Sequence, residues 1–353
     1  MARDTISNST RRTYVAAERL FKEYCYDEDI APEASNITPA RAANFIAWMV
    51  HETNLQGASI ANYKSGIRYW WLEQTRWREG LNPFDSVVVN AVLSGVKRNR
   101  LDSDREARAC RPVTTPIGPG LLSKLKPFLM PMQDTMAPDN QLIIWAAACL
   151  AACALLRPNE FLGSDQWKER HLQHEQIIFH RRTFWNLDPD LDVWKISLPG
   201  TVYDCCPSRL TISLKLSKAD QLGKNADLIV SDPLAVRAMW VWCSRRACPA
   251  YGMKWLLEEP LFKPFGGRPL SIKVLCSTLS QAIAKFRGGA SPLVTGRCFR
   301  RGGNSELIML GKDRQYIQAI GRWKSRAMPI TYADPAVLAH RAAATAAGLM
   351  APL

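Results

Sequence analysis

The sequence has no hydrophobic segment long enough to cross a lipid bilayer. Its longest uninterrupted apolar run, residues 142–156, has 15 residues, whereas a spanning helix needs about 20. The first 14 residues contain no apolar stretch of signal-peptide length. We therefore expect an intracellular protein with no membrane partner, in which residues 142–156 form a buried core helix.

The sequence also lacks the patterns typical of disulfide scaffolds, metal sites and nucleotide-binding loops. Its ten cysteines are irregularly spaced and form no repeated framework, which favours a reducing compartment. Two ligand-like spacings, H-x-x-H at residues 171–174 and C-x4-C at residues 243–248, are not completed by second pairs. Because no glycine-rich phosphate loop is present either, the sequence predicts neither a metal nor another cofactor.

Acidic residues are scarce relative to basic ones. The chain has 32 Asp and Glu against 46 Lys and Arg, with a net charge of +14 and an isoelectric point near 9.5. Residues 266–353 alone hold 13 Lys and Arg but only three Asp and Glu. Aromatic and glycine residues lie among these charges, which favours a phosphate-binding surface over a merely solvated basic face.

The length of 353 residues and the 47% hydrophobic content indicate two domains with real cores. In the first part, apolar periodicity predicts four helices, the second opened by Thr38 as its cap and the third by Ser59. They cover residues 13–25, 38–54, 59–70 and 85–96. The following stretch, residues 97–120, is charged and then rich in Pro, Gly and Thr, so we place the domain boundary there.

The second part of the chain mixes helical and strand-like patterns. Strand-like runs cover residues 177–181, 193–198 and 209–216. Helical patterns cover residues 121–129, 142–156, 233–245, 273–285 and 302–309, and a short alanine-rich helix is expected within residues 334–350. The predicted fold class is therefore mainly α with a small antiparallel sheet (α+β).

Three polar residues, Arg157, Glu160 and Lys218, are candidates for phosphate binding or proton transfer. Arg157 directly follows the long apolar run, and Glu160 follows three residues later. A guanidinium held there suits a phosphate, although such an arginine on its own is more often a structural ion pair. Lys218 lies in a polar turn between two strand-like runs, where a lysine either reaches into a cleft or only solubilises the turn.

The densest signal lies near the carboxyl end. It consists of TGRCFRRGG at residues 295–303, AIGRWKS at 319–325 and TYAD at 331–334. Together with LLRPNE and SKADQ, these motifs stand in the order that resembles the tyrosine recombinase (phage integrase-like) superfamily. The segments SKADQ, RRGG and GRWKS look most similar to the Crypton and DIRS-type mobile-element recombinases of eukaryotes.

The resemblance implies a domain organisation and a catalytic set. A helical core-binding (SAM-like) DNA-binding domain would cover residues 1–100, a basic linker 101–118, and a catalytic domain with a tail helix 119–353, together forming a C-shaped DNA clamp. The implied catalytic residues, with Glu160 in support, are Arg157, Lys218, Arg297, Arg300, Trp323 and Tyr332.

The roles implied by the resemblance are those of metal-free phosphoryl transfer. Arg157 and Arg300 would bind the non-bridging oxygens of the scissile phosphate, and Lys218 would protonate the departing 5′ oxygen. Trp323 would donate its indole N–H to the phosphate or pack beside the nucleophile, and Tyr332 would attack phosphorus to leave a 3′-phosphotyrosyl enzyme.

One position departs from the family pattern. Arg297 stands where the family has His or Lys, three residues before Arg300. Because an arginine cannot act as a base near neutral pH, the proton of Tyr332 would have to pass to water or to a phosphate oxygen. Arg301 competes for the role of Arg300, but the spacing of Arg300 before Gly302 fits the family better.

Candidate DNA contacts fall into two groups. The third helix presents Asn62, Lys64, Ser65 and Arg68, which would read base edges in a major groove or form a solvated face. Phosphate contacts are expected from residues in or near the linker and from one catalytic-domain arginine, namely Lys97, Arg98, Arg100, Arg105, Arg108, Arg111 and Arg301.

The expected function is site-specific recombination of double-stranded DNA for integration or excision of a mobile element. The resemblance implies a homotetramer on paired DNA sites, joined by exchange of the carboxyl-terminal tail, and a nuclear location if the host is eukaryotic. Two alternatives stay open: a relaxing enzyme like the type IB topoisomerases, and a catalytically inactive, domesticated DNA-binding protein.

Overall fold

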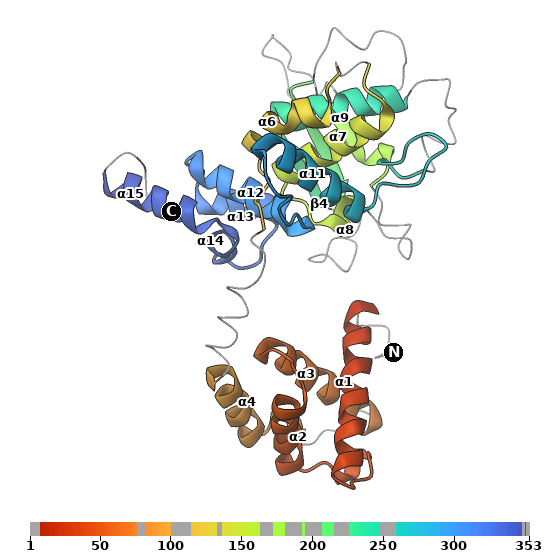
Figure 1. Ribbon diagram of the computed structural model, residues 1–353, viewed down its shortest axis with the longest axis vertical. Helices are drawn as coiled ribbons and strands as arrows, with labels where there is room; N and C mark the ends of the chain where they lie inside the picture. Colours follow the sequence, from red (N-terminus) through yellow and green to blue (C-terminus); the bar gives the residue numbers. More distant parts are fainter. Residues whose placement is uncertain are drawn as a thin grey trace. The chain divides into compact units, whose positions relative to one another are not determined.

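The computed structural model describes residues 8–75, 82–99, 114–132, 136–162, 172–180, 193–194, 207–214, 226–247, 259–347 and 350. The chain divides into two compact units, Met1–Arg111 and Pro112–Leu353 (Figure 1). The division falls inside the stretch 101–118 that the sequence predicts as a linker. None of the described helices is both long and apolar enough to cross a membrane.

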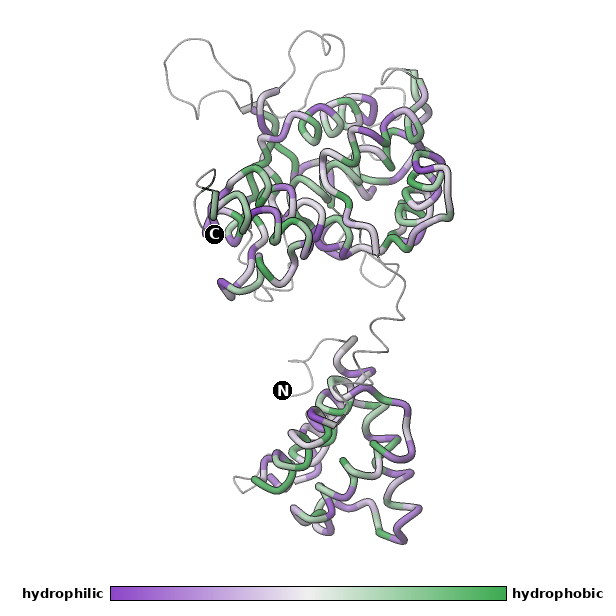
Figure 2. The backbone as a smooth tube through the Cα atoms, turned by 60° about the vertical axis from the view of Figure 1, so that its left-hand side comes forward, coloured by the Kyte–Doolittle hydropathy of each residue, from purple (hydrophilic) through white to green (hydrophobic). Residues whose placement is uncertain are grey.

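The described part of the first unit contains four α-helices around an aromatic core. The Phe21 ring packs edge-on against that of Phe45, with centroids 5.1 Å apart, and both side chains are buried. Apolar and polar segments alternate along the helices, as the periodicity predicts (Figure 2). The helices are α1 (Asn8–Asp27), α2 (Pro39–Glu52), α3 (Gly57–Gln74) and α4 (Val87–Asn99).

The two helix starts predicted in this unit have opposite outcomes. Thr38 caps α2, because its hydroxyl accepts a hydrogen bond from the Arg41 N–H at 3.2 Å. The predicted cap Ser59 is wrong: α3 begins at Gly57, and its N-cap is Gln56. The Ser59 N–H already donates to the Gln56 carbonyl at 2.8 Å, so the backbone is helical before Ser59 is reached.

The second unit combines helices with one small sheet, which confirms the predicted fold class. Of its described helices, α7 carries the most buried residues, ten, and it packs against α6, α9 and α12. The described helices of this unit are α6 (Pro119–Leu129), α7 (Asp139–Cys153), α8 (Pro158–Phe161), α9 (Pro233–Arg246), α11 (Ile272–Arg287), α12 (Gly296–Met309), α13 (Arg314–Gly321), α14 (Met328–Tyr332) and α15 (Pro335–Ala346).

The described strands form a four-stranded antiparallel sheet in the order β2-β1-β3-β4. The strands are β1 (Ile177–His180), β2 (Val193–Trp194), β3 (Arg209–Leu214) and β4 (Ala226–Val230). Alternate side chains of β3 are buried, with Leu210 opposite Phe179 and Ile212 opposite Leu228. The three predicted strand-like runs therefore each hold a strand, and β4 continues the sheet beyond β3.

The prediction that residues 142–156 form one continuous helix is wrong, because α7 ends at Cys153. Leu155 has a left-handed backbone with φ of 48°, and the Leu156 N–H donates to the Ala151 carbonyl at 3.0 Å. This closes the helix and turns the chain while both leucines stay buried. Arg157 therefore leaves the core at the turn rather than on a helical face.

The helix predicted at residues 302–309 begins earlier, at Gly296, with Thr295 as its N-cap. Gly302 and Gly303, where the predicted helix starts, lie inside α12. There the helix approaches the backbone of residues 117–118 and of Ala152 closely. A Cβ on Gly303 would overlap the Ala152 carbonyl and come within 2.6 Å of Leu155 Cδ2. Close packing of α12 on α7, rather than helix termination, explains Gly303.

The last four helices form a cluster with its own small core (Figure 1). Leu155, Ile308, Ile317, Trp323 and Ala333 are buried together there. The short helix α13 was not predicted. Its N-cap is an aspartate, residue 313, whose carboxylate accepts from the N–H three residues later at 2.7 Å. This cluster brings the three carboxyl-terminal motifs together.

Candidate active site

Arg157 is the N-cap residue of α8, immediately after the turn that closes α7. Its Nη1 donates to Glu160 Oε1 at 2.7 Å, and its backbone N–H donates to Glu160 Oε2 at 2.7 Å. The Glu160 side chain is 2% exposed and that of Arg157 27% exposed. The carboxylate therefore fixes Arg157 from the inside and leaves part of the guanidinium open to a ligand.

A second arginine shares this carboxylate. Arg322 Nη2 donates to Glu160 Oε2 at 2.7 Å. Burial alone would raise the pKa of Glu160, but Arg322 and then the N–H and guanidinium of Arg157 lower it, and the net pKa lies below its ordinary value. Glu160 is therefore ionised at neutral pH. Arg322 is not among the site residues predicted from the sequence, although it stands inside the GRWKS motif between Gly321 and Trp323.

Arg300 is a buried cation at the centre of the site, only 2% exposed. Its Nη2 donates to the Gly321 carbonyl, whereas Nε and Nη1 are buried without a hydrogen-bond partner among the described residues. Burial, helped by the charges of Arg157 and Arg322, lowers the pKa of Arg300 to about 9. The guanidinium still carries its proton at neutral pH, with two donors unused.

Two aromatic rings cover Arg300. Its Cζ lies 4.7 Å from the Trp323 ring centroid and 5.9 Å from that of Tyr332. The two rings also contact each other, with centroids 5.3 Å apart. The buried Trp323 Nε1 has no hydrogen-bond partner among the described residues. Arg300, Trp323 and Tyr332, which the sequence predicts as catalytic, are thus in direct contact.

The segment that carries Tyr332 is tied to α12 on both sides. Before the tyrosine, buried Asn304 donates through Nδ2 to the Pro329 carbonyl at 2.8 Å. After it, the Asp334 N–H donates to Ser305 Oγ at 2.9 Å. One face of α12 therefore fixes the position of Tyr332 relative to Arg300.

The remaining predicted catalytic positions have different surroundings. Arg297 is exposed in the first turn of α12, and no hydrogen bond or ion pair joins it to another described residue. Arg301 donates to Thr114 Oγ1 at 3.2 Å and to Asp334 Oδ2 at 3.3 Å, so Arg300 and not Arg301 faces the aromatic pair. Lys218 lies outside the described residues.

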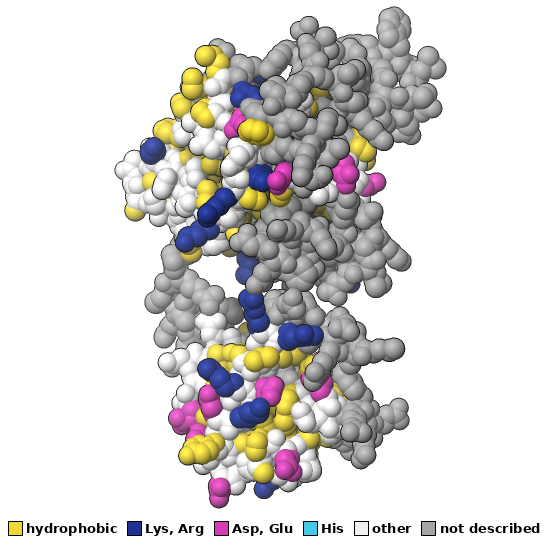
Figure 3. All heavy atoms as spheres, turned by 90° about the vertical axis from the view of Figure 1, so that its right-hand side faces the viewer, with side chains coloured by type: hydrophobic (Ala, Val, Ile, Leu, Met, Phe, Trp, Pro, Cys, Tyr) yellow, Lys and Arg dark blue, Asp and Glu magenta, His cyan; other side chains and the backbone are white. Residues whose placement is uncertain are grey.

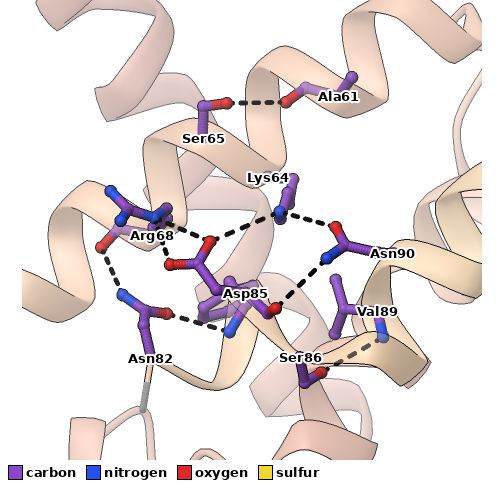
Figure 4. Close-up of polar contacts among 10 residues, drawn as sticks. Ala61, Lys64, Ser65, Arg68, Asn82, Asp85, Ser86, Val89 and Asn90 are labelled. Atoms are coloured by element: carbon purple, nitrogen blue, oxygen red, sulfur yellow. Dashed lines mark hydrogen bonds and ion pairs between the residues drawn. The ribbon is translucent and has the colours of Figure 1, made fainter. Parts of the chain in front are cut away.

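The predicted base-reading face of α3 is partly occupied by internal ion pairs. Arg68 Nε donates to both carboxylate oxygens of Asp85, at 2.9 and 2.7 Å, and Lys64 Nζ lies 3.7 Å from Asp85 Oδ1 (Figure 4). Lys64 also donates to Asn90 Oδ1 at 3.2 Å. Asn62 and Ser65 are exposed, and the Ser65 hydroxyl donates to the Ala61 carbonyl.

The predicted phosphate-contacting residues are described only in part. Lys97 and Arg98 lie in α4, where Arg98 is exposed. Arg100, Arg105, Arg108 and Arg111 lie outside the described residues. On the face of the first unit seen in Figure 3, basic and acidic side chains are interspersed among exposed apolar ones. The described residues of that face therefore do not form a continuous basic patch.

The local charge balance of the site favours an anion. Arg157 and Arg322 both form ion pairs with the carboxylate of Glu160, whereas Arg300 has no acidic partner at ion-pair distance among the described residues. The described residues contain no group of three or more His, Cys, Asp or Glu that could hold a metal ion. His171 and Cys248 of the two ligand-like spacings lie outside them.

Comparison with known proteins identifies the fold. No protein-family model and no curated protein matches the chain. Among solved structures, the Tn1549 transposon integrase bound to transposon right-end DNA matches with a TM-score of 0.52 and 15% identity, covering 98% of this chain and 96% of that one. The XerH site-specific recombinase, bound to its difH substrate after cleavage, matches with a TM-score of 0.55 and 16% identity, covering 96% and 79%. The chain thus has the tyrosine recombinase fold.

Proposed function

We propose that the chain is a site-specific DNA recombinase that cleaves and rejoins strands through a 3′-phosphotyrosyl intermediate. The observation that carries the proposal is the contact of Tyr332 and Trp323 with the buried, partly unpartnered guanidinium of Arg300. Buried donors without partners are costly in a folded protein unless a ligand uses them. A phosphodiester supplies the acceptors and the negative charge.

In the proposed reaction, Tyr332 Oη attacks the phosphorus while the bond from phosphorus to the 5′ oxygen breaks. Arg157 and Arg300 bind the non-bridging oxygens, and Trp323 offers its indole N–H to one of them. Lys218 gives a proton to the departing 5′ oxygen, and the phenolic proton passes to water or to a phosphate oxygen. Attack by another 5′-hydroxyl reverses the steps and rejoins the strand.

DNA binding must also open the site. Because Arg300 is only 2% exposed, a phosphate can reach it only after a neighbouring side chain moves. Tyr332 is the side chain expected to move, since its hydroxyl has to approach phosphorus from the side opposite the leaving oxygen. The ring contact between Tyr332 and Trp323 is then a resting arrangement that the bound DNA replaces.

The biological setting and assembly belong to the same proposal. SKADQ, RRGG and GRWKS support a mobile-element recombinase of the Crypton or DIRS type, acting by integration and excision on paired sites as a homotetramer. In the single chain, α15 packs on α12, and buried Arg341 donates to the Ile308 carbonyl. Tail exchange would remake this contact on a neighbouring subunit.

Covalent capture tests the proposal. A duplex selected for binding from a random pool is prepared as a set of substrates, each nicked at a different position, and incubated without metal. Cleavage next to a nick releases a short fragment, so a protein–DNA adduct accumulates on a denaturing gel. We expect an adduct with wild type and with Tyr316→Phe, an exposed tyrosine of α13, but none with Tyr332→Phe.

Other outcomes favour the alternatives. An adduct formed by Tyr332→Phe would refute the assigned nucleophile. Binding without any adduct would favour a DNA-binding protein that has lost catalysis. The arginine at position 297, where the resembling family has His or Lys, would then reflect that loss. An adduct from a complex that sediments strictly as one protein per DNA, even on paired sites, would favour a relaxing enzyme over a recombinase.

A further inference from the structure

Arg322 occupies a backbone position that favours glycine. It is the C-cap of α13, with φ of 51° and ψ of 43°, and its N–H donates to the Ala319 carbonyl at 3.0 Å. This left-handed conformation is strained for a side chain as large as arginine. The Arg322 side chain is nevertheless 11% exposed, held inside the protein rather than extended into solvent. Its contacts therefore offset the backbone strain.

Those contacts join three separate elements. Arg322 Nη1 donates to the Ile320 carbonyl at 2.9 Å and to the Ala154 carbonyl at 3.3 Å. Its Nη2 donates to the Leu155 carbonyl at 3.3 Å and to Glu160 Oε2 at 2.7 Å. One planar guanidinium thus connects the end of α13 with the turn after α7 and with α8. A lysine, with its point charge, cannot reproduce this fork.

The shared carboxylate passes this constraint to Arg157. Glu160 Oε2 accepts from both the Arg157 N–H and Arg322, while Oε1 accepts from the Arg157 guanidinium. Arg322 also holds the carbonyl of Leu155, two residues before Arg157, in a second left-handed turn. Both the backbone and the side-chain partner of Arg157 are therefore fixed by Arg322.

We infer that Arg322 is a positioning residue that holds Arg157 in place for the scissile phosphate by way of Glu160. The inference rests on the proposed function, because it assigns Arg157 to the phosphate. In the proposed reaction Arg322 itself does not contact the reacting atoms, because both of its terminal nitrogens donate hydrogen bonds to groups of the protein. Its role is to keep the phosphate-binding guanidinium in one orientation.

The inference predicts a defect in the rate of cleavage and not in DNA binding. Arg322→Gly removes the side chain but suits the left-handed backbone, so the helix end is retained. At saturating protein, we expect its rate constant for adduct formation on the nicked duplex to fall about 10²-fold, with the Kd for intact duplex changed by less than about twofold. Arg326→Gly, an exposed arginine in the same segment, should react at the wild-type rate.

A double-mutant cycle tests the path through Glu160. Arg322→Gly, Glu160→Gln and the double variant are compared in the same adduct assay. If Arg322 acts through Glu160, the double variant should be about as slow as the slower single variant. If instead the two losses multiply, the two residues act independently and the inference is overturned.

A folding control and a wild-type control keep the outcomes separable. Thermal melts establish that each variant is folded; if Arg322→Gly is not, Arg322→Lys replaces it and should show an intermediate loss of rate with unchanged Kd. If the wild-type protein forms the adduct and the Arg322 variants form it at the same rate, this inference alone is overturned. Absence of any wild-type adduct on bound DNA overturns the proposed function as well.

Discussion

At the scale of residues, the site is a case of buried charge organised around one acceptor. Glu160 is nearly inaccessible to solvent, and Arg157 and Arg322 both bind it. A buried ion pair contributes little beyond its desolvation cost, but leaving one member unpaired is severely destabilising. Glu160 therefore serves two purposes, since it compensates part of the positive charge of the two arginines and orients Arg157, the more exposed of them.

Glu160→Gln should destabilise the protein in a pH-dependent way. The largely buried guanidinium of Arg322 and the partly exposed one of Arg157 then lose their counterion, and we expect the free energy of unfolding near neutral pH to fall by about 3 kcal/mol. The folded-state pKa of Glu160 lies below its ordinary value of 4.5. Its contribution is therefore complete above that value and is lost as pH falls through the folded-state pKa.

Urea unfolding of wild type and Glu160→Gln from neutral pH down to about pH 3 measures this directly. The difference in free energy of unfolding between the two proteins should be largest at neutral pH and should shrink below the ordinary pKa of a glutamate. A difference of constant size across that range would mean that the ionisation of Glu160 does not contribute to stability.

At the scale of elements, α12 organises the candidate site. One face packs closely on α7 through Gly303, and other residues of the helix hold the Tyr332 segment through Asn304 and Ser305. Arg300 extends from the same helix to the Gly321 carbonyl. A small displacement of α12 would therefore change the positions of Tyr332, the proposed nucleophile, and of Arg300, the proposed phosphate-binding cation, together.

Gly303→Ala and Gly95→Ala should have opposite effects on stability. Both glycines lie inside helices, but a Cβ on Gly303 would overlap the Ala152 carbonyl, whereas a Cβ on Gly95 in α4 meets nothing within 4 Å. We expect Gly303→Ala to cost about 1–3 kcal/mol or more by overpacking. Gly95→Ala should stabilise by about 0.5–1 kcal/mol through helix propensity.

Thermal or urea unfolding of the two variants provides the comparison, and adduct formation should be impaired only in Gly303→Ala. Equal stabilisation by both alanines would show that α12 does not need the close approach to α7 at Gly303.

The same elements show which features a sequence can predict. Local signals were sufficient for the Thr38 cap and for a strand within residues 209–216. They failed at Gly302 and Gly303, which resemble a helix start and lie inside a helix. Close approaches and left-handed turns depend on distant partners, so the role of Arg322, 162 residues from Glu160, could not be predicted from its neighbours.

At the scale of the whole molecule, the excess positive charge is the property most directly tied to a nucleic-acid partner. Several cations are already neutralised internally, as Arg68 and Lys64 are by Asp85. Their ion pairs compete with phosphate contacts, so the count of 46 Lys and Arg overstates the number of cations available to DNA. Residues 101–118 hold three arginines beside two Asp and one Glu. The predicted sequence-independent phosphate contacts come from these arginines and from Lys97, Arg98 and Arg100 just before them.

The salt dependence of DNA binding should separate these two classes of cation. Each phosphate contact contributes roughly 0.9 to the slope of log Kobs against log salt concentration on duplex DNA. Replacing Arg105 and Arg108 by Gln should therefore flatten the slope by about 1.8 if both contact phosphates.

A matched control replaces Arg19 and Lys22 of α1, which form ion pairs with Glu23 and Glu18, and removes the same charge. Because those two cations already have acidic partners, the slope for the control variant should stay close to that of wild type. Equal flattening by both pairs would mean that net charge alone, and not a specific linker contact, governs binding to DNA.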